Sequence, residues 1–378
     1  MKKPTLAKYV KPAIITLICL ILIIAATFTG CQLSSIADGD KTPNTPETEG
    51  ETDTNEDVEN EKNDPVLPQP TPVVLYNVLT GLKTTSDLAD LRPVAICIEN
   101  TPYSMPQYGI SSAEVLIEVP LEDGTTRLMM LTTNYNQVTT IGAVSSTRPY
   151  LLELGAAFGA IQAFKGSDGT VSDETLALYS ILDSTNKKLA GIFYTDPTRF
   201  SEMDLMTNGI LLDSGIRRNE LSPTLDGAIS IPYQFTDEGT SVVPNDGEAT
   251  NINIQYSQDL NVNYMYDSKS GTYLRSQFGT AQLDGNNGKQ VSFDNLFILH
   301  TSSVTYDKED STSLDLIIED GGSGYYISGG AYEAITWQQT EDGSITFFDK
   351  DGAKLEVNRG TSYIGMVAAG AMESVTIK

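Results

Sequence analysis

Hydrophobic and polar positions along residues 74–224 alternate in a way that predicts strands and helices in turn. Residues 94–98 are apolar on both alternating faces, which is typical of a strand covered on each side. Helical spacing of apolar residues follows Pro149 and again follows Ser172, a good N-cap. The other strand-like runs are 115–119, 128–131, 160–164 and 192–194. This alternation predicts an α/β layered first domain.

From residue 225 the pattern changes to short β-rich runs joined by turns that contain glycine. Residues 264–267 are expected to pair with 272–275, and residues 335–339 with 345–348. Residues 345–348 are expected to pair also with 355–357. Glycine supplies the positive φ that such turns need. We therefore expect a mostly antiparallel second domain over 225–378, and an α+β fold overall.

The first thirty residues have the pattern of an export signal. Four lysines precede an apolar run over 13–28, and small residues follow just before Cys31. The Gly30-Cys31 junction resembles a bacterial lipobox, in which the cysteine receives a fatty acid such as palmitate. The alternative is an uncleaved membrane anchor, because the run is just shorter than the roughly 17 residues that span a bilayer. Either way, the rest of the chain is expected on the extracytoplasmic face of the cell membrane.

Residues 31–73 are predicted to be a disordered acidic tether. Between positions 32 and 64 there are eleven acidic residues, two lysines and no aromatic residue. Such a composition cannot bury enough apolar surface to fold. Fully extended, these positions reach about 110 Å, so the folded part is expected to stand off the membrane.

Charge and composition exclude several classes of function. The formal net charge of −26 argues against nucleic acid and anionic lipid headgroups as partners. His300 is the one histidine, and Cys97 is the one cysteine after Cys31, so a zinc site of the usual ligand count cannot be built. Neither a G-x-S-x-G elbow nor a P-loop occurs. We expect no metal, no cofactor and no recognisable catalytic set, and Cys97 reads as a small buried hydrophobe.

Polar side chains follow two of the predicted buried strands. Glu99 and Asn100 come after the first, and Lys165 and Ser167 lie in the loop after 160–164. If these strands are parallel neighbours, their ends meet at one edge of the sheet, where open sheets place ligands. The alternative for Glu99 is an ordinary carboxylate at a strand end.

Four more charged residues are site candidates. Glu118, Glu122 and Arg127 fall near the predicted hairpin turn at 122–124, and Arg148 precedes the next helix. The simpler interpretation of the hairpin is a solvated turn with one surface ion pair, worth roughly 0–1 kcal/mol. The functional one is a shallow polar site in which Arg127 and Arg148 take a carboxylate- or phosphate-bearing envelope component, or an acidic loop of an envelope protein.

Two kinds of catalysis stay open on the residues alone. Carboxylates such as Glu99, Glu118 and Glu122 are the groups that act as acid and base on a glycan. Lys165 and Ser167 are of the types that form a Ser-Lys pair. A hydrolase of cell-wall glycan or peptide is therefore the alternative to a binding protein.

Four segments together resemble the YerB-like bacterial lipoproteins, a two-domain family of Gram-positive envelopes with no established reaction. They are RPVAICIEN, MPQYGISSAEVLIEVPLEDGTTRL, IGAVSSTRPY and GSGYYISGGAYEAITW, within a resemblance that spans residues 75–367. The resemblance implies an exported lipoprotein. Glu118, Glu122, Arg127 and Arg148 match the family pattern.

The chain also departs from that pattern. Ser145 stands where the family tends to have a basic residue, and Phe164 or Lys165 stands where it tends to have a histidine. The family's Pro-His-Asn-Leu run is replaced here by residues 202–205. If those histidines carry chemistry elsewhere, this member is expected to lack it. We therefore expect a non-catalytic binding or accessory protein of the cell envelope.

Overall fold

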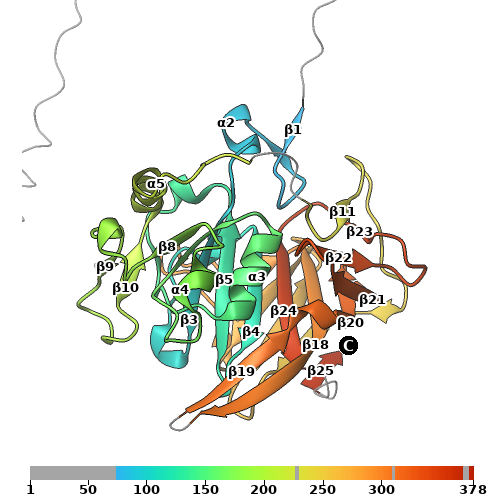
Figure 1. Ribbon diagram of the computed structural model, residues 1–378. Coiled ribbons are helices and arrows are strands. Elements are labelled where there is room, and N and C mark those ends of the chain that lie inside the picture. Colours follow the sequence, from blue (N-terminus) through green and yellow to red (C-terminus); the bar gives the residue numbers. More distant parts are fainter. Residues whose placement is uncertain (1–73, 226–229, 309–310, 369–373) are drawn as a thin grey trace, which may run out of the picture. The chain divides into compact units, whose positions relative to one another are not determined.

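The computed structural model describes residues 74–225, 230–308, 311–368 and 374–378 (Figure 1). The predicted signal, Cys31 and the predicted tether lie outside the described residues. From Pro70 onward the chain forms one compact unit. Among the described residues, no helix is long and apolar enough to cross a membrane.

A sheet of twelve strands organises this unit, and both parts of the chain contribute to it. The first part supplies an antiparallel group, in which β5 (Thr126–Thr132) lies between β3 (Val94–Asn100) and β4 (Val115–Pro120). Next to β3 run β7 (Ile161–Phe164) and β8 (Ile181–Asp183), both parallel. The strands expected at 94–98, 115–119 and 128–131 are thereby confirmed.

The second part extends the same sheet from β4. The parallel neighbour of β4 is β24 (Ser362–Ala368), which pairs in parallel with β18 (Asn295–Lys308). Antiparallel strands follow: β20 (Gly322–Ser328), β21 (Ala331–Gln339) and β12 (Gly247–Glu248). Two strands branch off: β19 (Ser311–Ile317) pairs with β18, and β22 (Ile345–Phe348) pairs with β21. Because one sheet runs through both parts, the division at residue 224 stays a prediction.

A second, antiparallel sheet covers one face of the first. It contains β13 (Asn251–Gln255), β14 (Asn261–Asp267), β15 (Thr272–Gln277), β16 (Thr280–Ala281), β17 (Ser292–Phe293) and β25 (Val375–Ile377). Its inward residues share one hydrophobic core with Ile96, Ile98 and Leu116 of the large sheet. Tyr264 meets Tyr363 with ring centroids 4.8 Å apart, which joins the two sheets.

The other face of the large sheet carries a second core with α3 (Pro149–Ala157). The other helices of the described residues are α2 (Ser86–Ala89), α4 (Asp173–Leu176) and α5 (Gly209–Arg218). The expectation of an α/β layered first domain is therefore wrong in its detail. The strands are buried on both faces as predicted, but one of the covering layers is a β-sheet. The fold is β-rich, and the description α+β fits it only loosely.

Predicted hairpins are confirmed in two cases and corrected in a third. Tyr264 pairs with Arg275 across β14 and β15, and Thr336 pairs with Phe348 across β21 and β22. The strand β23 (Glu356–Val357) instead pairs in parallel with β11 (Gln234–Phe235). The predicted antiparallel contact with 345–348 is limited to the bridge between Phe348 and Lys354, beside which the Leu355 amide donates to the Phe347 carbonyl at 2.8 Å. The turn at 349–352 therefore predicts where the chain reverses direction, but β23 forms its strand pairing with β11.

Short elements complete the described chain. The strands are β1 (Leu75–Tyr76), β2 (Lys83–Thr84), β6 (Ile141–Gly142), β9 (Tyr194–Thr195) and β10 (Leu205–Thr207). The 3-10 turns are η1 (Pro102–Ser104), η2 (Ile110–Ser112), η3 (Tyr135–Gln137), η4 (Lys187–Leu189) and η5 (Ile318–Asp320).

Candidate functional site

The candidate residues separate onto two faces of the large sheet. Successive residues of a strand point to opposite faces, so Glu99 and Asn100 diverge at the end of β3. Glu99 pairs in register with Arg127, on the face that α3 covers, and Asn100 pairs with Thr126 on the other. Glu118 lies on the Asn100 face, toward the second sheet. The predicted site is therefore two clusters.

The first cluster is a buried charge pair between Glu118 and Arg275. Glu118 Oε2 accepts from Arg275 Nη2 at 2.7 Å and from the Tyr363 hydroxyl at 2.8 Å. Its Oε1 accepts from Thr126 Oγ1 at 2.7 Å and from Asn100 Nδ2 at 3.2 Å. Both charged side chains are 0% exposed. The expected solvated hairpin with a surface ion pair is therefore wrong for Glu118.

Arg275 connects this cluster to the second sheet. It also donates to Gln282 and, at 2.9 Å, to the Tyr264 hydroxyl. Burial alone would lower the pKa of Arg275, but the charge of Glu118 and the neighbouring tyrosines outweigh burial and raise it. Asn100 Oδ1 accepts from Gln277 Nε2 at 2.8 Å. Glu118 and Asn100 therefore hold the two sheets together, and neither is accessible to a ligand.

The second cluster begins with Glu99, Arg127 and Ser145. Arg127 donates to the Glu99 carboxylate and to Ser145 Oγ, and the Ser145 hydroxyl donates to Glu99 Oε2 at 2.5 Å. The Arg127 side chain is 6% exposed and that of Glu99 is 14% exposed. Arg127 thus has a sheltered pair with Glu99. Ser145, which departs from the family pattern, completes this pair.

Arg148 lies at the start of α3, and its hydrogen-bond partners form the next part of the second cluster. Its Nη2 donates to Glu122 Oε1 at 2.7 Å, and its Nη1 donates to Asp168 Oδ2 at 3.2 Å and to the Thr147 carbonyl at 3.0 Å. The Arg148 side chain is 8% exposed, but that of Asp168 is 59% exposed. Burial opposes the charge of Arg148, and Glu122 outweighs it, so the pKa of Arg148 is raised. Within the described residues, Arg148 Nε and Glu122 Oε2 are buried without a hydrogen-bond partner.

The loop after β7 joins this second cluster, as predicted for parallel neighbours. The Lys165 amide donates to the Ser145 carbonyl at 2.8 Å, and the Thr147 amide donates to the Gly166 carbonyl at 3.0 Å. The side chains of Lys165 and Ser167 donate to different carbonyls, those of Glu202 and Val171, each at 3.4 Å. The loop thus lies beside both arginine pairs. Its lysine and serine are engaged separately, which is not the geometry of a Ser-Lys pair.

A pocket of about 130 Å³ opens beside Arg148. One wall is Arg148, Pro149 and Thr170, and the other is the β18–β19 hairpin, which Figure 1 shows in front of the sheet below α3. The hairpin residues are Tyr306, Ser313, Leu314 and Asp315. Burial, and then the charge of Glu319, raise the pKa of Asp315. Arg148 is thus the candidate that reaches a concave surface.

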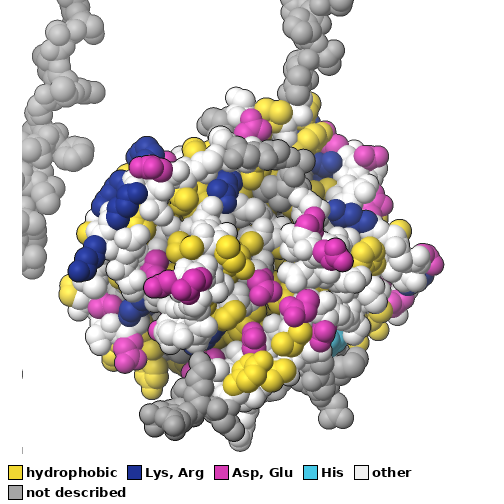
Figure 2. Space-filling model, in the orientation of Figure 1, with side chains coloured by type: hydrophobic (Ala, Val, Ile, Leu, Met, Phe, Trp, Pro, Cys, Tyr) yellow, Lys and Arg dark blue, Asp and Glu magenta, His cyan; other side chains and the backbone are white. Residues whose placement is uncertain are grey.

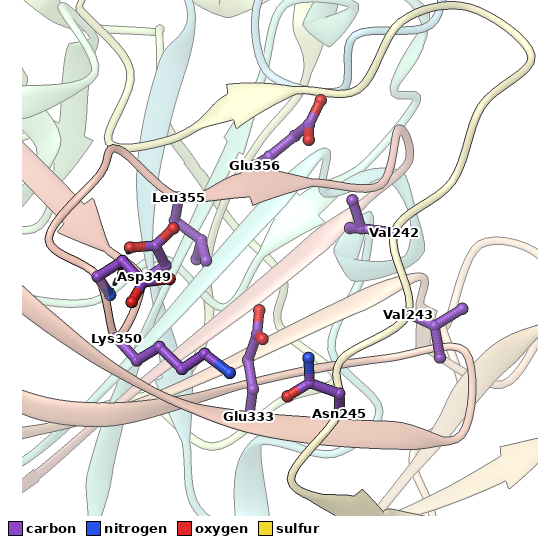
Figure 3. A pocket seen from close by; sticks show the side chains of 9 residues that line it. Val242, Val243, Asn245, Glu333, Asp349, Lys350, Leu355 and Glu356 are labelled. Atoms are coloured by element: carbon purple, nitrogen blue, oxygen red, sulfur yellow. Dashed lines mark hydrogen bonds between the residues drawn. The ribbon is translucent and has the colours of Figure 1, made fainter.

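A larger hollow of about 340 Å³ lies elsewhere, between β21, β23 and the turn at 349–351 (Figure 3). Carboxylates dominate it, with Glu333 and Lys350 extended toward each other. Burial, and then Asp246, raise the pKa of Glu333. Among the described residues, no three His, Cys, Asp or Glu side chains are grouped so as to hold a metal ion. The sequence interpretation of 349–352 as a hairpin turn agrees with its observed 349–352 hydrogen bond.

Several residues of the clusters and the pocket are not predicted from the sequence. Three of them are charged, Arg275, Asp168 and Asp315, and Ser145 enters the sequence analysis only as a departure from the family pattern. For Arg275 a signal existed, because it follows the inward-facing Tyr273 by two positions in β15 and so lies on the same, buried face. Asp168 and Asp315 carry no comparable signal.

Comparison with known proteins places most of the described chain in one family. Residues 79–222 match the N-terminal domain of a protein family of unknown function, DUF3048, and residues 252–364 match its C-terminal domain. The "Putative lipoprotein YerB" of Bacillus subtilis (strain 168) is 27% identical over 298 residues, covering 76% of this chain and 85% of that protein. The crystal structure of the Bacillus subtilis YerB protein matches with a TM-score of 0.70 at 24% identity, covering 80% of this chain and 99% of that one. The resemblance to YerB-like proteins is confirmed, and the chain belongs to the DUF3048 family.

Proposed function

We propose that the protein is a membrane-anchored lipoprotein of the cell envelope that binds a ligand without transforming it. The name of the Bacillus relative and the Gly30-Cys31 junction support the anchor. Cys31→Ala is expected to leave an uncleaved precursor that takes up no fatty-acid label in growing cells. An unlabelled, full-length wild-type protein would instead mean a transmembrane anchor.

The proposed ligand site is the pocket beside Arg148. The observation that supports it is that the two carboxylates paired with the Arg148 guanidinium differ in distance and in exposure. Glu122 binds it at 2.7 Å and is 22% exposed, whereas Asp168 binds it at 3.2 Å and is 59% exposed. An exposed pair of this kind is worth only about 0–1 kcal/mol. A carboxylate or phosphate of a ligand can therefore replace Asp168 at small cost, while Glu122 keeps the guanidinium in place.

The start of α3 adds to this preference for an anion. The helix has nine residues with Arg148 as its N-cap, so its positive end faces the pocket side. Arg148 then offers a planar, charged donor that suits carboxylate and phosphate oxygens. Arg127 is sheltered and already engaged by Glu99 and Ser145. We assign it the role of fixing Ser145 in the segment that leads to Arg148.

The hydrolase alternative is less well supported by these contacts. Glu118 is fully buried against Arg275 and cannot reach a substrate. Glu99 and Glu122 are each already engaged by an arginine of the protein. Release of products from purified cell wall, abolished by Glu122→Gln, would favour the hydrolase over the binding protein.

Titration calorimetry with N-acetyl-alanine and glycerol 3-phosphate tests the site directly. Arg148→Met is expected to lose binding of the anion, and Asp168→Asn to strengthen it about two- to fivefold, because a competing carboxylate is removed. Arg217→Met is the matched control, since that arginine is 66% exposed and paired only along its own helix. Unchanged affinities in Arg148→Met would refute the site.

A further inference from the structure

We propose that the pocket beside Arg148 receives the carboxyl end of an extended peptide, whose main chain pairs with the free edge of β19. This inference rests on the proposed anion site and names the class of its ligand. It depends on an arrangement that the anion site does not require. The Arg148 guanidinium and the unpaired edge of β19 border the same pocket.

The first observation is the open edge. Strand β19 pairs with β18 from Ser302↔Ile317 to Lys308↔Ser311, and within the described residues it pairs with no other strand. The outer edge of such a strand presents a row of N–H and C=O groups that need partners. Proteins commonly protect edges with proline, lysine or a bulge, but residues 311–317 read STSLDLI. This edge is therefore suited to accept another strand.

The second observation is where that edge lies. Ser313, Leu314 and Asp315 of β19 form one side of the 130 Å³ pocket, and Arg148 with Pro149 forms the other. At about 30 Å³ per water molecule, this volume corresponds to roughly four waters. The pocket can thus enclose the carboxylate and α-carbon of one terminal residue, while the rest of the peptide continues along β19.

The strand is held firmly enough to act as a template. Leu314 packs on the core beneath α3, and its neighbour Leu316 is 3% exposed in the same core. Tyr306, which lines the pocket, is 49% exposed, and Val304 on the same ribbon is 40% exposed. Exposed apolar side chains on the face of the ribbon opposite Leu314 and Leu316 suit the side chains of a bound peptide.

The carboxylates on the β18–β19 ribbon favour a peptide over a polyanion as the ligand. Asp315 lies in the pocket wall, and Glu319 follows β19 in the turn η5. A ligand with many phosphates would place its further charges against these carboxylates. A peptide carries one carboxylate, which meets Arg148, and a neutral main chain, which meets the strand edge.

The test uses the full chain in detergent and the peptide acetyl-Thr-Ala-Thr-Ala as a probe, in its free-acid and amide forms. The free acid is expected to bind at least tenfold more tightly than the amide and than N-acetyl-alanine. Arg148→Met is expected to lose binding of the free acid, and Arg217→Met to keep it. N-methylation of the probe at alternate residues is expected to alternate between loss and retention of binding, because only every second N–H faces β19.

The outcomes distinguish this inference from the proposed function. Equal binding of the peptide acid and N-acetyl-alanine, or equal effects at all N-methylated positions, would overturn the strand pairing while leaving the anion site intact. Failure of N-acetyl-alanine, glycerol 3-phosphate and the peptide together would overturn both. Because the N-methyl series alters only the probe, misfolding of a protein variant cannot imitate either result.

Discussion

Replacing Arg275 with methionine should be among the most damaging single changes in this protein. The substitution leaves the Glu118 carboxyl group 0% exposed, with its charged partner gone. Tyr363 and Thr126 can still donate to the carboxylate, at 2.8 and 2.7 Å, but neither carries a charge. Breaking a buried pair by removing one partner costs about 3–5 kcal/mol.

That cost is large against the whole stability of the fold. Domains of ordinary size unfold with about 5–15 kcal/mol, and 1 kcal/mol shifts the melting temperature of a large domain by about 2 °C. Arg275→Met should therefore melt about 6–10 °C lower than the wild type. Calorimetric melting and urea unfolding at pH 7 measure this directly.

A paired variant separates a charge effect from a packing effect. In Glu118→Gln with Arg275→Met, no charge is left buried, so the loss should be smaller than the sum of the two single losses by about 1–3 kcal/mol. Exact additivity of the two losses, or a loss below about 1 kcal/mol for Arg275→Met alone, would refute this account of the cluster.

Three further predictions concern single positions. Gly209→Ala should lower stability by about 1–3 kcal/mol, because the added carbon would lie 2.0 Å from the Tyr135 carbonyl oxygen; urea unfolding checks it. Cys97 should react with a thiol reagent at pH 8 only after unfolding, because it is 1% exposed and burial raises its pKa to about 11. Burial, then Glu319, raise the pKa of Glu153. The folded state then binds more protons than the unfolded one between the unfolded pKa, about 4.3, and the raised value, so stability should fall as pH rises through that window. Glu153→Gln should flatten that dependence in melts from pH 4 to 8.

The strands were predictable because their apolar runs are continuous. Residues 94–98, 115–119 and 128–131 correspond to β3, β4 and β5, and the turn at 122–124 joins the last two. A run that is apolar on both faces shows that both faces are covered, but not what covers them. The layer over Ile96 and Ile98 comes from β13–β15, more than a hundred residues later, where helices had been expected.

The charged residues of the site could be found, but not their partners. Glu118 and Arg275 are 157 positions apart, and the pairing depends on how two sheets pack rather than on any local pattern. The pairs of Arg127 with Glu99 and of Arg148 with Glu122 are closer in sequence, at 28 and 26 positions. For Arg127 and Glu99 the choice of partner follows from strand register, which hydrophobic periodicity constrains only by face. Glu122 lies in the turn between β4 and β5 and Arg148 at the start of α3, so their pairing depends on how the helix packs on the sheet.

Register also decides which of these residues can meet a ligand. Glu99 and Asn100 are neighbours in the chain, yet the pleat of β3 turns Asn100 into the network with Glu118 and turns Glu99 toward Arg127. A change on the Asn100 side should therefore act through stability, whereas a change at Arg148 should act through binding. Figure 2 shows acidic side chains scattered over the face in front of α3 and α4, as the strongly acidic composition leads one to expect. It follows that stability and ligand affinity should respond to separate sets of substitutions, because the Glu118–Arg275 pair and the pocket beside Arg148 lie on opposite faces of the large sheet.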